Sequence, residues 1–311
     1  MGEFELIAAI RRSCNKLPAN GFEGIGDDCA VLPLGGGEAL VFTCDALCEG
    51  VHFLRHATTP EQLGAKSLAV NLSDVAAMGV QPVATLLALS LPADLEPDWA
   101  ERFIAGYTAL AERYGVALIG GDTTRSQQGV VISVMAIGRG PEAALKRRRD
   151  ARAGDTIFVS APLGASGAGL RDILGGAFDT PLAAIHRAPT PEIEAGRWLG
   201  SRPEVHAMMD LSDGLASDLR HILTESGVGA AIELEQIPVA AGATLDDALS
   251  GGEDYKLLFT AEAATTLAAD FEAAFGRPLY PVGRIVGGTA TIQWFRHGRP
   301  VEGTWQGFRH F

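Results

Sequence analysis

The 311-residue chain has few cysteines and no long apolar run. The cysteines lie in the first 50 residues without the paired C-x-x-C spacing of zinc and redox motifs: Cys14, Cys29, Cys44 and Cys48. Since the N-terminus has no apolar signal stretch, we expect reduced, structural cysteines and a cytoplasmic protein. A transmembrane helix needs about 20 consecutive apolar residues, so we expect no membrane partner either.

Basic residues are also scarce. The chain has 25 lysines and arginines against 38 aspartates and glutamates, a formal net charge of −13. Nucleic acids and anionic membranes bind basic surfaces, so neither is expected as a partner. The acidic balance suits a protein that gathers divalent cations, although surplus surface acid is the commoner reason for it. With 47% hydrophobic residues, the chain has enough apolar material for two folded domains of about 150 residues each.

Familiar catalytic motifs are missing. The sequence contains no Gly-Lys-Ser/Thr of a Walker A loop, no G-x-S-x-G elbow, and nothing that singles out a Ser/His or Cys/His pair. This absence makes sense if the acceptor of the reaction is itself a phosphate. A phosphomonoester is largely ionised at neutral pH and needs little help from a general base. Catalysis then rests on positioning and on charge neutralisation by metal ions.

Hydrophobic periodicity predicts alternating strands and helices in both halves of the chain. One helix begins at Thr59, whose side chain caps it together with Gln62, and ends at Gly79. A second runs over 98–114 and stops at Gly115. Strands are expected at 39–43, 83–91, 116–119 and 130–137, then at 156–160, 206–209, 230–234 and 255–260, with further helices at 213–224 and 261–275.

A basic cluster, Lys146 to Arg149, leads into Gly154-Asp155 and separates two halves of similar make-up. We therefore expect one domain at 1–148 and a second at 149–311. Some neighbouring strands have no crossover helix between them, so the sheets should be mixed. The predicted fold class is α/β (α+β), with two α/β domains.

Aspartates stand at predicted strand ends or in glycine turns, where side chains of separate elements converge. A single aspartate at such a place usually caps a helix or forms a turn. Several together repel one another unless cations lie between them, and magnesium prefers hard oxygen ligands that share it with substrate phosphates. We therefore favour a site for several magnesium ions among Asp27, Asp28, Asp45, Asp122, Asp210 and Asp213.

Asp74 lies inside the first predicted helix, on the same face as Ser67 and Asn71. The rest of that segment is mainly alanine, leucine and valine, which indicates a buried helix. Polar side chains on a buried helix need partners. Asp74 therefore joins the candidate metal ligands.

Two segments offer backbone N–H groups to a phosphate. The small-residue turn at 160–169 fits an anion site and close helix–strand packing equally well, and Ser212 begins a helix in the same way. The arginines at 147–149 fit either a solvated loop or a clamp on nucleotide phosphates.

Eight segments, in order along almost the whole chain, resemble the thiamine-monophosphate kinases of the aminoimidazole ribonucleotide synthetase superfamily: GEFELI, GIGDDCAVL, TCDALCEGVHF, KSLAVNLSDVAAMGVQP, LIGGDTT, DLSDGLASDL, LSGGEDYKLLFT and WQGFRHF. The resemblance implies that ATP phosphorylates thiamine monophosphate by direct, magnesium-assisted in-line transfer, without a dedicated side-chain base. It also implies a homodimer formed through the sheet of the N-terminal domain, which binds metal and ATP, while the C-terminal domain completes the nucleotide and substrate site.

The resemblance assigns roles by position. It implies metal ligands at Asp28, Thr43, Cys44, Asp45, Asp74, Asp122, Asp210 and Asp213. Cys44 replaces a family threonine and is expected to contribute its backbone carbonyl. ATP contacts fall on Gly121, Asp122, Arg148 and Ser212, with Arg147 or Arg149 as alternatives to Arg148. Thiamine monophosphate contacts fall on His52, Glu253 and Phe308. Without the resemblance, a structural role is the commoner interpretation of each of these three residues.

Two competing functions share these features. A sister synthetase of the superfamily uses ATP to activate a carbonyl oxygen on the same aspartate scaffold, but the GVHF, NLSDVAAMG and GGEDY segments favour the kinase. A non-catalytic module that binds thiamine diphosphate or metal would keep an aromatic and acidic pocket without a metal cluster sized for a triphosphate.

Overall fold

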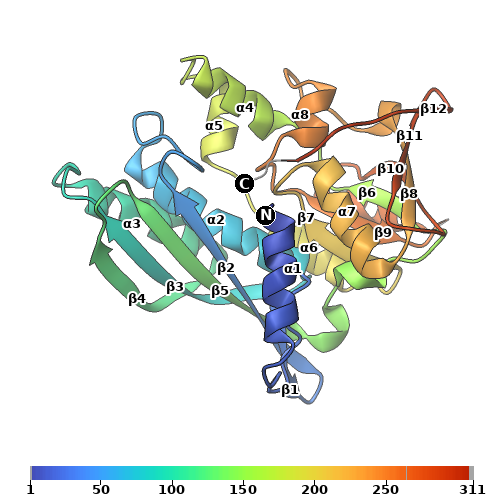
Figure 1. Ribbon diagram of the computed structural model, residues 1–311, viewed down its shortest axis with the longest axis horizontal. Coiled ribbons are helices and arrows are strands. Elements are labelled where there is room, and N and C mark those ends of the chain that lie inside the picture. The colour runs from blue at the N-terminus through green and yellow to red at the C-terminus, as the bar shows by residue number, and fades with distance from the viewer. Residues whose placement is uncertain (1, 264, 308–311) are drawn as a thin grey trace.

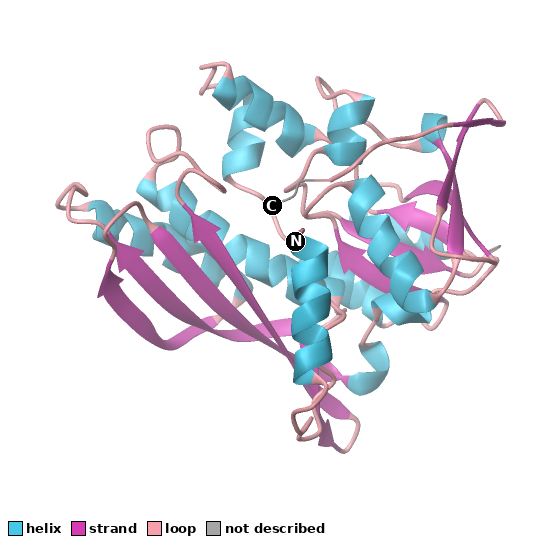
Figure 2. Cartoon of the chain, viewed as in Figure 1, coloured by secondary structure: helices cyan, strands magenta, loops and turns pink. Residues whose placement is uncertain are grey.

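Two mixed β-sheets, each with its own helices, make up the chain, and they lie side by side (Figures 1 and 2). The computed structural model describes residues 2–263 and 265–307. The first sheet has the order β1-β2-β5-β3-β4, and its strand pairs are antiparallel except for β3 with β4. Its strands are β1 (Ala30–Gly35), β2 (Glu38–Cys48), β3 (Gln81–Leu91), β4 (Ala117–Arg125) and β5 (Val131–Pro141).

Helices α2 (Pro60–Ala77) and α3 (Trp99–Tyr114) pack on this sheet and on each other. Their backbones nearly touch, because a Cβ at Gly106 would lie only 1.9 Å from the carbonyl oxygen of Glu61. Gly115 ends α3 in the left-handed conformation, φ 67°, as the sequence predicts. Thr59 and Gln62 form the predicted capping box of α2.

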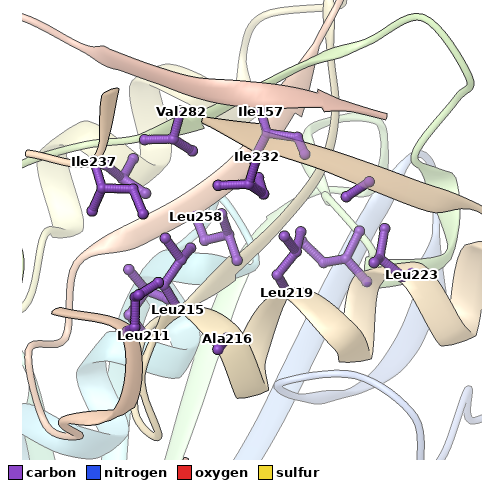
Figure 3. Packing of buried hydrophobic residues seen from close by; sticks show 14 of the residues in the cluster. Ile157, Leu211, Leu215, Ala216, Leu219, Leu223, Ile232, Ile237, Leu258 and Val282 are labelled. Atoms are coloured by element: carbon purple, nitrogen blue, oxygen red, sulfur yellow. The ribbon is translucent and has the colours of Figure 1, made fainter. Parts of the chain in front are cut away.

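The second sheet has seven strands in the order β12-β11-β8-β10-β6-β9-β7. Figure 3 shows its core, where Leu215, Leu219 and Leu223 of α7 pack against Ile157 and Ile232 of the sheet. Its strands are β6 (Thr156–Val159), β7 (Val205–Asp210), β8 (Gly229–Glu233), β9 (Leu257–Ala261), β10 (Tyr280–Val286), β11 (Ile292–Arg296) and β12 (Arg299–Val301). The other helices are α1 (Glu3–Cys14), α4 (Ala165–Leu174), α5 (Pro181–Arg187), α6 (Ile193–Gly200), α7 (Leu215–Ser226), α8 (Leu245–Ser250) and α9 (Leu267–Phe275).

Helix α2 lies between the two halves and is buried along most of its length, as its composition predicts. Helix α6 of the second half packs so closely on it that a Cβ at Gly196 would lie 2.2 Å from the carbonyl oxygen of Ala76. Side chains of α2 therefore reach both halves. This position explains how a single helix can supply polar groups to a site shared by two sheets.

The fold class and the mixed sheets are confirmed, while several element bounds differ from the predictions. Strand β2 is longer than the strand predicted at 39–43, because it pairs with β5 as far as Cys48. Helix α9 begins at Leu267, not at 261. The connection between the two sheets spans 142–155, and the boundary expected at 148/149 stays a prediction within it. Among the described residues, no helix combines the length and apolar character that a membrane span requires.

Candidate functional site

Three carboxylates from different elements meet where the two halves face each other. Asp28 lies in the loop before β1, Asp74 on α2, and Asp210 at the end of β7. One oxygen of each lies within 4.8 Å of the others. Asp28 and Asp210 are buried. The predicted convergence of aspartates is therefore present for these three.

The polar face of α2 holds β2 against this cluster. The backbone N–H of Asp45 donates to Oδ1 of Asn71 at 3.1 Å, and the Asn71 amide donates to the carbonyl of Ser67 at 3.0 Å. Thr43 donates a short hydrogen bond from its hydroxyl to Asp74. Since Thr43 and Asp45 are two residues apart on one strand, they share a face of the sheet. Both therefore lie on the face of β2 that α2 covers.

Cys44 lies between them and points to the opposite face. Its side chain is exposed, and its Sγ lies 3.4 Å from the hydroxyl of Ser133 on β5. Strand geometry therefore directs the Cys44 side chain away from the cluster. The backbone carbonyl is the group that remains for it.

Burial makes the charged forms of these carboxyls costly. It raises the pKa of Asp45 to about 6 and that of Asp210 to about 8, and the neighbouring Asp28 adds to both shifts. Burial also raises the pKa of Asp74 well above its usual range, with Asp45 as the next cause. Such a set gains from any cation placed among its oxygens, because the cation favours the ionised forms.

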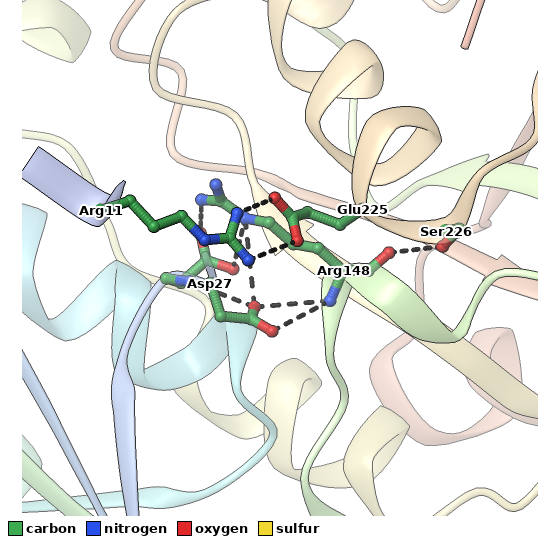
Figure 4. A network of polar contacts seen from close by, with 6 residues as sticks. Arg11, Asp27, Arg148, Glu225 and Ser226 are labelled. Atoms are coloured by element: carbon green, nitrogen blue, oxygen red, sulfur yellow. Dashed lines mark hydrogen bonds and ion pairs between the residues drawn. The ribbon is translucent and has the colours of Figure 1, made fainter. Parts of the chain in front are cut away.

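Arg148 is the arginine of the basic cluster that reaches the aspartates (Figure 4). Its guanidinium pairs with Asp28, its backbone N–H donates to Asp27 at 3.2 Å, and its carbonyl accepts from Ser226 at 2.7 Å. Arg147 and Arg149 turn away and both pair with Glu23. Of the three alternatives left by the sequence, the geometry places Arg148 at the cluster.

Ser212 and Asp213 follow β7 and lead into α7 through Gly214, which has a φ of 102°. Sequence reasoning missed Asp218, one turn further along. Its Oδ2 accepts the backbone N–H groups of Asp213 at 3.1 Å and Gly214 at 3.0 Å, so it fixes the turn that carries Ser212 and Asp213. The segment DLSDGLASDL contains Asp218, but its spacing alone does not distinguish it from a solvated helix residue.

A cavity of about 260 Å³ starts at the aspartates and runs between the halves. Asp45, Asp74, Ser212 and Asp213 line one part of it. A second cavity of about 180 Å³ adjoins it. The residues that line both define what we call the junction pocket: Val51, His52, Leu170, His186 and Glu253. Two predicted substrate residues, His52 and Glu253, thus lie in the same hollow as the carboxylates.

Local backbone structure presents both residues to the junction pocket. His52 accepts the backbone N–H of Cys48 on Nδ1 at 3.0 Å, which leaves the ring proton on Nε2. Glu253 follows Gly251 and Gly252 and has a φ of 65°, a conformation rare outside glycine. Its backbone N–H donates to the carbonyl of Ser212 at 2.7 Å. Backbone strain of this kind clusters at functional sites.

Sequence reasoning also missed Lys66 and His186, the partners of Glu253. Lys66 is 1% exposed, and its ammonium lies 2.9 Å from the Glu253 carboxylate. His186 is buried, and its Nδ1 lies 2.9 Å from the hydroxyl of Ser166. This is a Ser/His pair that the sequence did not reveal. Ser166 has no exposed surface, however, so its hydroxyl is not open to a substrate.

Gly121 and Asp122 are not brought to the aspartates within the described chain. They lie on β4, at the edge of the sheet, with β3 and β5 between them and β2. Every residue of β4 is exposed. Asp122 was expected at a strand end or glycine turn and instead lies inside the strand. Phe308 lies outside the described residues.

Comparisons with known proteins agree with this architecture. The model of the AIR synthase related protein N-terminal domain matches residues 26–140, and that of the C-terminal domain matches 152–294. The chain is 38% identical over 325 residues to the thiamine-monophosphate kinase of Salmonella typhimurium, covering 100% of this chain and 98% of that protein.

Two solved structures are similar over nearly the whole chain. One is described as AaThiL complexed with AMPPCP and TMP, with a TM-score of 0.85, 34% identity, and coverage of 100% of this chain and 97% of that chain. The other is thiamine-monophosphate kinase from Stenotrophomonas maltophilia, with a TM-score of 0.77, 37% identity, and coverage of 97% and 99%. The chain therefore belongs to the thiamine-monophosphate kinase family of AIR synthase-related proteins.

Proposed function

We propose that the protein transfers the γ-phosphoryl group of ATP to thiamine monophosphate and releases thiamine diphosphate and ADP, as an enzyme of thiamine diphosphate biosynthesis. One observation carries this proposal: a single cavity joins the aspartate cluster to the junction pocket with His52 and Glu253. The test is to incubate the purified protein with Mg-ATP and thiamine monophosphate. Thiamine diphosphate and ADP in equal amounts are expected, and ADP without thiamine diphosphate would refute the proposal.

The donor set of the cluster fits magnesium. Its side-chain groups are carboxylate and hydroxyl oxygens, their ionised forms are costly without a cation, and three carboxylate oxygens lie within 4.8 Å of one another. We propose as ligands Asp28, Thr43, Asp45, Asp74, Asp210 and Asp213, with the backbone carbonyl of Cys44 and with Asp122. When bound, magnesium supplies charge neutralisation for the transferring phosphoryl group. A chelator such as EDTA should abolish turnover, and excess magnesium should restore it.

On the nucleotide side, the proposal assigns the phosphates to Arg148 and Ser212. Arg148 carries a fixed positive charge beside Asp28, and its planar guanidinium suits phosphate oxygens. Ser212 lies in the turn before α7 and lines the cavity. On the acceptor side, His52, Glu253 and Phe308 would hold the thiamine portion, whose flat rings suit an aromatic face.

A homodimer would account for Gly121 and Asp122. Strand β4 is an exposed edge with apolar side chains, including Leu118 and Ile119, and natural proteins cover such edges. We propose that a second copy covers this sheet and that Gly121 and Asp122 serve the nucleotide and metal site in that assembly.

Changing Ile119 to lysine tests the dimer. Ile119 is 60% exposed, so the fold should tolerate the charge, whereas a covering copy should not. Sedimentation velocity should show a dimer for the wild type and a monomer for Ile119→Lys, with similar melting temperatures. Leu17→Lys, at a leucine 67% exposed outside both sheets, should remain dimeric. A variant at Ile119 that stays dimeric argues against this interface.

The transfer should occur in one step. The Ser166–His186 pair is closed to substrate, and no other nucleophile with an activating base is found among the described residues that line the cavity. With ATP chiral at the γ-phosphorus, a single in-line displacement inverts the configuration. Retention of configuration, or a trapped phosphorylated residue, would indicate two successive transfers.

A further inference from the structure

Lys66 is a charged residue that the proposed mechanism does not use, although it lines the second cavity beside the junction pocket. Its Nζ is 2.9 Å from both carboxylate oxygens of Glu253 and donates to the carbonyl of His52 at 3.4 Å. A buried ammonium is tolerated only when it is paired and hydrogen-bonded. Since Lys66 comes from α2 and Glu253 from the loop before β9, the pair also joins the two halves of the chain.

The two oxygens of Glu253 have different surroundings. Oε2 accepts a hydrogen bond from Lys66 and lies 3.4 Å from Nδ1 of His186. Burial and the charge of Lys66 lower the His186 pKa to about 4, so this ring is neutral at neutral pH. Oε1 lies 2.9 Å from the same ammonium as its ion-pair partner, but it is buried and accepts no hydrogen bond of good geometry within the described chain. Since a carboxylate oxygen can accept two hydrogen bonds, Oε1 keeps the capacity to accept one from a donor that the chain itself does not supply.

The charge of the pair restricts what that partner is. A lone carboxylate attracts any cation, but Lys66 and Glu253 together carry no net charge. A neutral pair with one unsatisfied acceptor instead favours an N–H donor. Thiamine monophosphate carries such a donor in the exocyclic amino group of its pyrimidine ring.

We propose that Lys66 is a positioning residue that holds the Glu253 carboxylate in place, with Oε1 set to accept a hydrogen bond from this amino group. The inference rests on the proposed function and deepens it. Lys66 itself need not touch the substrate. Its effect is exerted through Glu253, and it selects for an amino group over an oxygen at the same ring position.

The test compares thiamine monophosphate with an analogue in which an oxo group replaces the amino group. The wild type should prefer the amino substrate in kcat/KM by at least about tenfold, because the oxo group places an acceptor against a carboxylate.

Lys66→Met keeps the chain length and removes the charge. Glu253 then loses the partner that fixes the direction of its oxygens. The KM for thiamine monophosphate should rise about tenfold, the preference should approach one, and the KM for ATP should change less than about twofold.

Two further variants separate positioning from general stability. If Lys66 acts through Glu253, adding Lys66→Met to Glu253→Gln should change neither the KM nor the preference further. Lys146 is a matched control, since it is also buried and donates to the carbonyl of Arg202 at 2.8 Å. Lys146→Met should lower the melting temperature without altering the preference.

Three outcomes would overturn the inference. They are an unchanged preference in folded Lys66→Met, an additive further loss in the double variant, and an undiminished preference in Glu253→Gln. The last variant decides the matter even if Lys66→Met does not fold. A wild-type protein that makes no thiamine diphosphate refutes the proposed function instead, and the two failures are thereby distinct.

Discussion

Asp74→Asn should lower kcat by about two to three orders of magnitude, or about 3–4 kcal/mol of transition-state stabilisation. Asparagine keeps the shape of the side chain and can still accept the hydrogen bond from Thr43. It loses the charge that, with Asp28 and Asp210, makes this place favourable for a cation. Steady-state turnover of thiamine monophosphate under saturating Mg-ATP measures the effect.

The same variant should not be less stable than the wild type. The pKa of Asp74 is raised well above its usual range by burial and by Asp45. A carboxyl of this kind binds more protons in the folded chain than in the unfolded one. Its presence therefore lowers stability as the pH rises past the ordinary aspartate range. At neutral pH and without metal, Asp74→Asn should melt at the same or a higher temperature.

Asp98→Asn is the matched control for this prediction. Asp98 is exposed before α3 and makes no side-chain capping bond, so turnover should remain at the wild-type level. Near-wild-type turnover in Asp74→Asn would show that α2 carries no metal ligand. A large loss of stability in the variant would instead assign Asp74 a structural role.

The sequence identified the candidate carboxylates of the site better than it predicted where the fold places them. Asp28, Asp74 and Asp210 stand out because acidic residues in turns, at strand ends and on a buried helix all need an explanation. Asp122 has the same local signal, yet β4 places it at the far edge of the sheet. Strand order is decided by long-range pairing, and the residues around Asp122 do not encode it.

Element bounds failed where tertiary pairing extends a strand beyond its apolar core. Strand β2 continues past Asp45 because its backbone pairs with β5 residue by residue, up to Cys48 opposite Val131. The polar side chains there do not interrupt the hydrogen-bonded ladder. Helix bounds set by local chemistry were predicted well, as the Thr59 cap of α2 and the Gly115 stop of α3 show.

Buried polar partners were the hardest residues to find. A lysine, a histidine and an aspartate inside helices usually face solvent or fill a core without a special role. Lys66, His186 and Asp218 become significant only because the fold places them against Glu253 or the turn at Asp213. Each acts on a residue that the sequence did single out, so the missed residues support the predicted ones.

Free thiamine should be a poor substrate, with kcat/KM lower than that of thiamine monophosphate by at least about two to four orders of magnitude. Its hydroxyl must lose a proton during attack on the γ-phosphorus, whereas the phosphate of thiamine monophosphate is already ionised at neutral pH. A general base contributes about a hundredfold to ten-thousandfold where one is present.

Among the described residues around the cavity, neither the two histidines nor Asp45 and Asp210 are available as that base. His186 has a pKa of about 4 and is too weakly basic, and His52 already accepts the backbone N–H of Cys48 on Nδ1. Asp45 and Asp210, with pKa values raised to about 6 and 8, have the required basicity, but as proposed metal ligands they would not be open to take up a proton.

Free thiamine should nevertheless compete with thiamine monophosphate, because the junction pocket would still accept its rings. The measurement is thiamine monophosphate formed from free thiamine, together with the competitive inhibition constant of thiamine. Comparable kcat/KM values for the two acceptors would mean that one of these groups does act as a base, and the base-free mechanism would then be wrong.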